Sequence, residues 1–257
     1  MIIMNEPCIQ LSVIMPAYNE ERRLPPYLAG VVEYLGSAFD RECVEVIVVD
    51  DGSTDATAAV AAGMAVDGGM IRVLKLPCNR GKGYAVRAGM LAARGAMRLF
   101  SDADGATPID ELQKLLAALE AGADIAVASR ALPDGSRTVA SRLHRKVIGN
   151  IFNLLVRYLA VPGIRDTQCG FKLFRGDVAD ELFGRQRTDG FGFDVELLFL
   201  AQKRGYRTVE VPVNWSDVPG SKVNVVSDSV RMLRDIMKTR INWLLGRYDV
   251  KLERKEF

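Results

Sequence analysis

Two aspartates after an apolar run are the residues of this sequence best suited to bind a metal ion. Residues 100–108 read FSDADGATP, so Asp102 and Asp104 follow a strand pattern and precede a DG turn. Two carboxylates separated by one residue at a strand exit can hold a hard divalent cation, which completes its shell with substrate phosphate oxygens and water. The structural alternative is that Asp104 only begins the turn while Asp102 is solvated.

Three further polar segments follow apolar runs in the first half of the chain. They are PAYNEE after LSVIM, DGSTD after VEVIVVD, and NRGKGYA after IRVLKL. Lys82 lies between two glycines with Arg80 nearby, so its ammonium could reach a diphosphate; a flexible loop with exposed cations is the alternative. Each segment alone also suits an ordinary turn or helix cap. Together with DADG they put four polar segments at the ligand-binding edge of an open parallel sheet.

The elements that must position these segments are predicted by the hydrophobic pattern. We expect strands at 11–16, 44–50, 71–76, 96–102 and 124–130, and helices at Glu20–Leu35, Ala56–Met64, Gly81–Arg94 and Pro108–Ala121. Strands that alternate with helices are typical of a parallel sheet. The first ~130 residues are therefore predicted to form an α/β sheet of the nucleotide-binding type.

The second half of the chain is more basic and more aromatic. We expect helices at Leu143–Leu159, Val195–Lys203 and Asp228–Leu245, the last with an apolar face bordered by cations. Basic amphipathic helices with aromatic residues can lie in a bilayer interface and attract anionic headgroups. Helices that pack into a core or form a dimer show the same pattern. A peripheral membrane surface is therefore one of two interpretations.

Composition indicates an ordinary globular protein. The 257 residues carry a formal net charge of +2, so we expect no nucleic-acid partner. Four scattered cysteines without a CxxC pair and one histidine leave little for a zinc site and favour a reduced, cytoplasmic protein. No segment reads as a signal peptide, and no run free of charge reaches the ~20 residues of a spanning helix. Contact with the cytoplasmic membrane face would therefore be peripheral.

Five strings together carry a resemblance to a known family. SVIMPAYNEE, VIVVDDGSTD, NRGKGYAVRAGM, FSDADGATP and DTQCGFKLF resemble family 2 of the nucleotide-sugar glycosyltransferases, an inverting group with the GT-A fold. DADGAT and DTQCGFKLF are most similar to its dolichyl-phosphate (polyprenyl-phosphate) β-glucosyltransferase branch. The resemblance implies one GT-A domain over 1–257, with a Rossmann-like, mostly parallel sheet flanked by helices. Its parts would be a nucleotide-sugar-binding half at 11–130, an acceptor half at 131–226, and a basic amphipathic helix and tail at 227–257.

The resemblance also implies roles for residues of the donor half. Asp102 and Asp104 would bind the ribose and a metal ion, Mg²⁺ or Mn²⁺, which bridges the diphosphate of UDP-glucose. Lys82 would approach the donor near Asp102, and Asp51 would contact the uracil base. The other residues implied to border the nucleotide sugar are Pro16, Ala17, Tyr18, Glu20, Asp50 and Ala103.

A polyprenyl phosphate is the acceptor that the resemblance implies. A phosphate monoester is already ionised near neutral pH, so it needs positioning by cations more than it needs a general base. Arg130, Arg142 and Lys222 match the family's acceptor-phosphate and flexible-loop positions. We predict that they orient the phosphate for in-line attack on the anomeric carbon, with Arg142 in a solvated helix face as the alternative.

Asp194 is a further candidate for a catalytic role. In many family members with a sugar-hydroxyl acceptor, a carboxylate on the later helix acts as base, and Asp194 and Glu196 lie in a comparable region. Either carboxylate could instead structure the acceptor loop, and one of them could cap the helix at Val195–Lys203.

Other functions remain open on the sequence alone. GDP-mannose as donor, or a soluble hydroxyl acceptor with a general base, would keep the same donor site. A non-catalytic nucleotide-binding module is an alternative from another class, although the metal pair and the acceptor cations are all present. A dinucleotide-binding dehydrogenase is not favoured, because PAYNEE and not GxGxxG follows the first strand.

Overall fold

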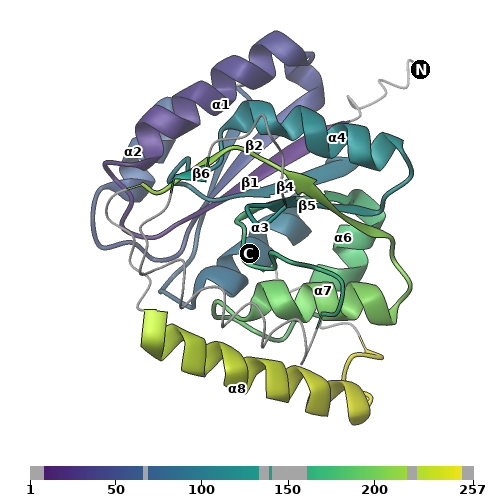
Figure 1. The fold of residues 1–257 in the computed structure, drawn as a ribbon. Helices are drawn as coiled ribbons and strands as arrows, with labels where there is room; N and C mark the ends of the chain where they lie inside the picture. The colour runs from purple at the N-terminus through teal and green to yellow at the C-terminus, as the bar shows by residue number, and fades with distance from the viewer. Residues whose placement is uncertain (1–8, 66–68, 133–138, 141–160, 219–224, 251–257) are drawn as a thin grey trace, which may run out of the picture.

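A seven-stranded, mostly parallel sheet forms the centre of the computed structural model, which describes residues 9–65, 69–132, 139–140, 161–218 and 225–250 (Figure 1). The strand order is β3-β2-β1-β4-β7-β5-β8. The strands are β1 Leu11–Ala17, β2 Val44–Asp50, β3 Ile71–Lys75, β4 Met97–Ser101, β5 Ile125–Ser129, β7 Phe171–Arg175 and β8 Thr208–Pro212. The short strands β6 Val139–Ala140 and β9 Trp215–Ser216 pair separately. The predicted α/β sheet is confirmed.

Helices cover both faces of this sheet (Figure 1). They are α1 Leu24–Ala38, α2 Thr57–Met64, α3 Lys82–Ala92, α4 Leu112–Glu120, α6 Gly176–Phe183, α7 Phe193–Lys203 and α8 Val225–Leu244. One core lies under α1 and α4, and a second lies under α3, α6 and α7. Because both faces are covered, all seven residues of β2 are buried, which explains the four consecutive apolar residues 46–49 at its centre.

Helix starts differ from the predicted starts where the backbone has a special conformation. The first helix begins at Leu24 and not at Glu20, with proline in its first turn, where a missing N–H costs nothing. Gly81 has φ 110°, a left-handed conformation that excludes it from α3. The helix predicted at Pro108–Ala121 begins with a 3₁₀ turn at Ile109–Glu111. The helix predicted at Leu143–Leu159 lies outside the described residues.

Strand β7 is the main feature that the hydrophobic pattern did not predict. It comes from the DTQCGFKLF string and lies antiparallel between β4 and β5. The strand direction matters, because the first residue of an antiparallel strand lies at the edge where its parallel neighbours end. Phe171 pairs with Ser101 in this register, so the residues before β7 lie beside those that follow β4.

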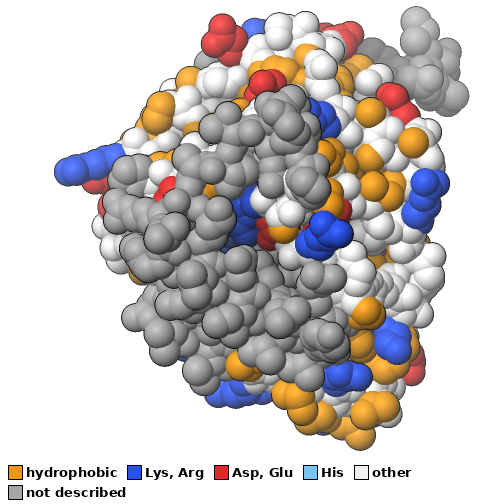
Figure 2. Space-filling view, viewed as in Figure 1, with side chains coloured by type: hydrophobic (Ala, Val, Ile, Leu, Met, Phe, Trp, Pro, Cys, Tyr) orange, Lys and Arg blue, Asp and Glu red, His pale blue; other side chains and the backbone are white. Residues whose placement is uncertain are grey.

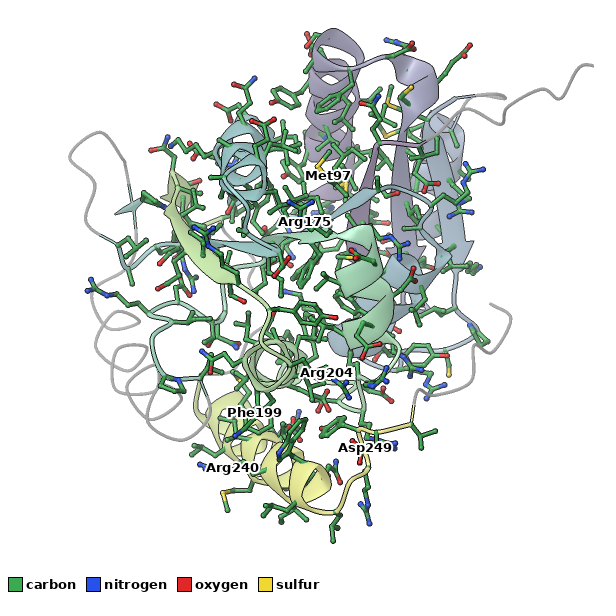
Figure 3. All side chains as sticks on the ribbon, turned by 90° about the vertical axis from the view of Figure 1, so that its right-hand side faces the viewer. Met97, Arg175, Phe199, Arg204, Arg240 and Asp249 are labelled. Atoms are coloured by element: carbon green, nitrogen blue, oxygen red, sulfur yellow. The ribbon has the colours of Figure 1, made fainter. Side chains whose placement is uncertain are left out.

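Helix α8 packs on α7, which itself lies against the sheet. Figure 3 shows α7, marked by Phe199 and Arg204, between the sheet and α8. The rings of Phe199 and Trp243 meet edge to face at 5.9 Å. Among the residues of α8 whose side chains the structure describes, Met232, Ile236 and Thr239 are buried. The predicted helix at Asp228–Leu245 is therefore confirmed, and one of its faces belongs to the core.

Candidate active site

The four polar segments meet at the carboxyl edge of the sheet, as the sequence predicts. Thr54 donates its backbone N–H to the side chain of Asn19, which joins DGSTD to PAYNEE. Gly81 donates its backbone N–H to Asp51, which joins NRGKG to the second strand. Lys82 then reaches the DADG segment. These contacts run from the first polar segment to the last, so the segments form one site.

An ion pair between Lys82 and Asp102 lies at the centre of this site. The Nζ atom of Lys82 is 2.6 Å from Oδ1 of Asp102, and both side chains are partly exposed. Burial opposes the charge on Lys82, but Asp102, followed by Asp194, raises the pKa of the ammonium above its ordinary value. Lys82 is therefore a fixed cation beside the DADG carboxylates, as predicted.

Asp104 is the second carboxylate of the pair. Its Oδ1 accepts a hydrogen bond from the backbone N–H of Ala106 at 3.1 Å, which orders the turn. Burial, followed by repulsion from Asp102, raises the pKa of Asp104. The turn that the sequence offered as one alternative is therefore present, and metal binding by the two carboxylates stays a prediction. A nearby cation would relieve the penalty on the ionised form.

The donor set around Asp102 and Asp104 fits Mg²⁺ or Mn²⁺. Both carboxylates supply the hard oxygens that these ions prefer. A Cβ atom at Gly170 would lie 2.0 Å from Oδ2 of Asp102, so only glycine leaves room for that carboxylate. Within the described residues no group of three or more Asp, Glu, His or Cys side chains forms a metal cage. The ligand itself would have to complete the coordination.

Asp50 is the last residue of β2, Asp51 follows it, and both are buried. The carboxylate of Asp51 accepts the backbone N–H groups of Arg80 and Gly81, each at 2.9 Å. Burial raises the pKa of Asp51, and the two hydrogen bonds oppose this shift. Asp50 accepts from the backbone N–H of Ser53, and its Oδ2 has no hydrogen bond with any described residue. Asp51 therefore holds the loop that carries Lys82, and its contact with a base stays a prediction.

The remaining donor-half candidates lie along the same edge. Pro16 and Ala17 end β1, Tyr18 is partly exposed, and Ala103 is buried between the two aspartates. Glu20 accepts two hydrogen bonds from the guanidinium of Arg23. This pairing, more than any other contact, raises the pKa of Arg23, and Asp104 and Asp102 add smaller effects in the same direction.

Arg130, the first acceptor candidate, directly follows β5 and is ion-paired. Its Nε and Nη2 atoms donate to the carboxylate of Asp166 at 2.7 and 2.9 Å. Asp166 is buried, which opposes its ionisation, but Arg130 outweighs this and lowers the pKa of the carboxyl. The guanidinium also lies 5.2 Å from the ring centre of Trp215. Arg142 and Lys222 lie outside the described residues.

Asp194 and Glu196 are both buried on α7, with different partners. Oδ1 of Asp194 is 2.5 Å from Nζ of Lys172. Burial raises the pKa of Asp194, and Lys172 and Lys82 oppose the shift. Glu196 accepts from the backbone N–H of Thr188 and the hydroxyl of Tyr248, so it structures the loop before α7. A base role for Asp194 stays a prediction.

Comparison of the sequence with models of known protein families identifies the family of this chain. Residues 12–183 match the model of glycosyl transferase family 2. The chain belongs to this family. It is 41% identical to the dolichyl-phosphate beta-glucosyltransferase of Drosophila melanogaster, over 98% of this chain and 81% of the relative. It is 38% identical to the human protein of the same name, over 98% of this chain and 82% of the relative.

Solved structures of related glycosyltransferases have the same fold. Glucosyl-3-phosphoglycerate synthase from Mycobacterium tuberculosis superposes with a TM-score of 0.65 at 21% identity, covering 95% of this chain and 81% of that one. Mannosyl-3-phosphoglycerate synthase from Rubrobacter xylanophilus gives 0.65 at 19% identity, covering 96% and 77%. The predicted GT-A fold and the predicted enzyme class, glycosyltransferase, are confirmed.

Several residues that support the site of this family 2 glycosyltransferase were not predicted from its sequence. Arg23 supports Glu20, Asp166 holds Arg130, Gly170 accommodates Asp102, and Lys172 neutralises Asp194. Three of them, Asp166, Gly170 and Lys172, belong to the DTQCGFKLF string. That string carried the family resemblance, but none of these residues was given a role from the sequence. An aspartate, a glycine and a lysine clustered around one short strand were the available signal. The division into donor and acceptor halves stays a prediction.

Proposed function

We propose that this glycosyltransferase moves glucose from UDP-glucose to a polyprenyl phosphate, with inversion at the anomeric carbon and with a divalent metal ion. The observation that carries the proposal is the cluster of Lys82, Asp102 and Asp104 at the carboxyl edge of the sheet. The names of the relatives, dolichyl-phosphate beta-glucosyltransferase, support the sugar and the acceptor class. A M. tuberculosis neighbour solved with Mn²⁺, UDP and phosphoglyceric acid supports the donor and the ion.

In this proposal the donor half binds and orients the nucleotide sugar. Lys82 donates to a diphosphate oxygen, while Asp50 and Asp51 border the base. A bound Mg²⁺ or Mn²⁺, held by Asp102 and Asp104, would neutralise the charge that develops on the leaving UDP. Asp104 stays ionised in that state because the cation offsets the cost of its burial.

The acceptor half supplies cations to a phosphate that is itself the nucleophile. Arg130 has a fixed orientation because Asp166 holds two of its nitrogens. Arg142 and Lys222 are proposed to complete the cationic site. An ionised phosphate monoester needs no proton removed before attack, so positioning replaces general-base catalysis.

We propose further that the enzyme meets its lipid as a peripheral protein on the cytoplasmic membrane face. A stripe of exposed apolar residues runs along the outer side of α8 and just beyond it: Met237, Ile241, Leu244 and Leu245, each at least 50% exposed. Cations border it at Arg231, Arg234, Lys238 and Arg240. Hydrophobic and basic side chains gather at this lower edge of the molecule in Figure 2. None of the helices in the described part is long and apolar enough to cross a bilayer.

An assay that detects released UDP and GDP tests the proposal. UDP-glucose and GDP-mannose are each incubated with Mn²⁺ or Mg²⁺, alone, with a short polyprenyl phosphate, or with 3-phosphoglycerate as a soluble acceptor. Release from UDP-glucose only when the lipid phosphate and the metal are present is the expected result. Equal release from GDP-mannose would overturn the donor, and stimulation by 3-phosphoglycerate alone would overturn the acceptor.

A further inference from the structure

Two carboxylates that come from different parts of the fold act on Lys82. Its ammonium contacts Asp102 directly at 2.6 Å, and Asp194 is the next carboxylate that acts on it. The start of α3 is packed tightly on the start of α7, because a Cβ at Gly83 would lie 2.8 Å from Cβ of Phe193. The helix that carries Lys82 therefore touches the helix that carries Asp194.

Lys172 is the buried ion-pair partner of Asp194. Its Nζ atom lies 2.5 Å from Oδ1 of Asp194 and donates to the carbonyl oxygen of Cys169 at 2.6 Å. Lys172 and Asp194 are both buried. Both lysines lie near the ring of Phe100, whose centre is 5.3 Å from Nζ of Lys82 and 5.7 Å from Nζ of Lys172. Charges of alternating sign thus run from the site into the core.

The order of these charges determines where the ammonium of Lys82 rests. A buried carboxylate without a cation is costly, so Asp194 must be neutralised by a neighbour. Lys172 does this from inside the core. If Lys172 lost its charge, Lys82 would be the other cation near Asp194, and moving toward it would take the ammonium away from Asp102.

We propose that Lys172 is a positioning residue, which keeps the ammonium of Lys82 at Asp102 by neutralising Asp194. Asp194 then affects donor binding only indirectly, through the position of the Lys82 ammonium. The inference rests on the proposed function only in that UDP is taken as the ligand of the site. The placement of Lys82 itself is a property of the protein without any ligand.

The first test is a crystal structure of the full chain carrying Lys172→Gln. Glutamine retains an N–H donor for Asp194 and Cys169 but removes the charge. The expected result is that Nζ of Lys82 leaves Asp102 and lies within hydrogen-bond distance of Asp194. A Lys82 that remains at Asp102 would overturn the inference, and this outcome does not depend on which nucleotide the enzyme uses.

The second test is UDP affinity by calorimetry in EDTA, which reports on Lys82 without metal or turnover. Lys172→Gln is expected to weaken UDP binding about tenfold, the effect of one displaced charge-assisted hydrogen bond. Adding Asp194→Asn removes the competing carboxylate, so affinity should recover to within about threefold of wild type. In a Lys82→Met background, Lys172→Gln should not change the UDP affinity further.

A merely structural role for Lys172 gives a different pattern. Arg98→Gln is the matched control, because Arg98 is another buried cation in an ion pair, with the partly exposed Asp180. Lowered thermal stability with unchanged UDP affinity in Lys172→Gln, as expected for Arg98→Gln, would overturn the inference. A loss of affinity that persists in the Asp194→Asn double variant or in the Lys82→Met background would also overturn it. Absence of UDP binding to the wild type in the presence of Mn²⁺ would instead overturn the proposed donor.

Discussion

The backbone N–H of Asp102 donates to the carbonyl oxygen of Gly170 at 2.9 Å, and the side chain of Asp102 occupies the space where a Cβ of residue 170 would lie. The first aspartate of the DADG segment is thus held by the residue just before an antiparallel strand. Any side chain at residue 170 must displace this carboxylate.

Gly170→Ala tests this contact. A Cβ 2.0 Å from a carboxylate oxygen cannot be accommodated without moving Asp102, so we expect metal-dependent UDP release to fall about 100-fold. Gly30→Ala is the control, since a Cβ at Gly30 in α1 meets no atom within 4 Å. The two variants are compared by rate at saturating Mn²⁺. Equal activity of both variants would contradict the role of Gly170.

Removal of Arg130 should reduce stability as well as turnover. Arg130→Met leaves Asp166 buried without its cation, and because Arg130 is partly exposed we expect a loss of about 2 kcal/mol in the free energy of unfolding. In the wild type the pKa of Asp166 is lowered, so its stabilising effect is present above about pH 4 and is lost as the pH falls through the lowered pKa.

The free energy of unfolding of the Arg130→Met variant should depend on pH with the opposite sign, so that it rises as the pH falls. Without Arg130, burial raises the pKa of Asp166, so the stability deficit should narrow as the pH falls from about 7 to about 5. Urea unfolding at several pH values measures this. A deficit that is constant with pH would show that the ion pair with Asp166 does not cause it.

Asp104→Asn separates metal binding from stability. Because the pKa of Asp104 is raised, its ionised form costs stability, and that cost grows as the pH rises from about 4 through the raised pKa. The asparagine variant should therefore melt a few degrees higher than wild type in EDTA near neutral pH. It should also lose the increase in melting temperature that Mn²⁺ and UDP give the wild type, and lose metal-dependent activity. An unchanged response to Mn²⁺ would exclude Asp104 as a metal ligand.

The apolar stripe on α8 predicts binding to anionic liposomes. Replacing Met237, Ile241 and Leu244 together by serine removes most of the exposed apolar surface, so co-sedimentation with liposomes should fall more than tenfold. Activity on a short, water-soluble polyprenyl phosphate should stay unchanged. Val250→Ser, at another exposed position, is the control. Wild-type protein that stays in the supernatant at low salt would refute membrane contact through this stripe.

Local patterns in the sequence were sufficient for much of the fold and the donor site. Apolar runs bounded by Asp, Asn and Gly predicted the strands that lead to Asp51, Lys82 and Asp102, because strand periodicity and turn chemistry are local properties. Parallel order then brings those strand ends to one edge whatever lies between them. The start of α1 was placed too early because the contribution of proline to the first turn was overlooked.

Only the tertiary structure decided how the charged residues of the site are paired. A five-residue strand such as β7 can join a sheet at any position and in either direction, so its place between β4 and β5 was not encoded in its own pattern. That placement brings Gly170 to Asp102 and Lys172 to Asp194. The sequence by itself determined which charged groups are available, and packing determined which of them are buried together and must neutralise one another.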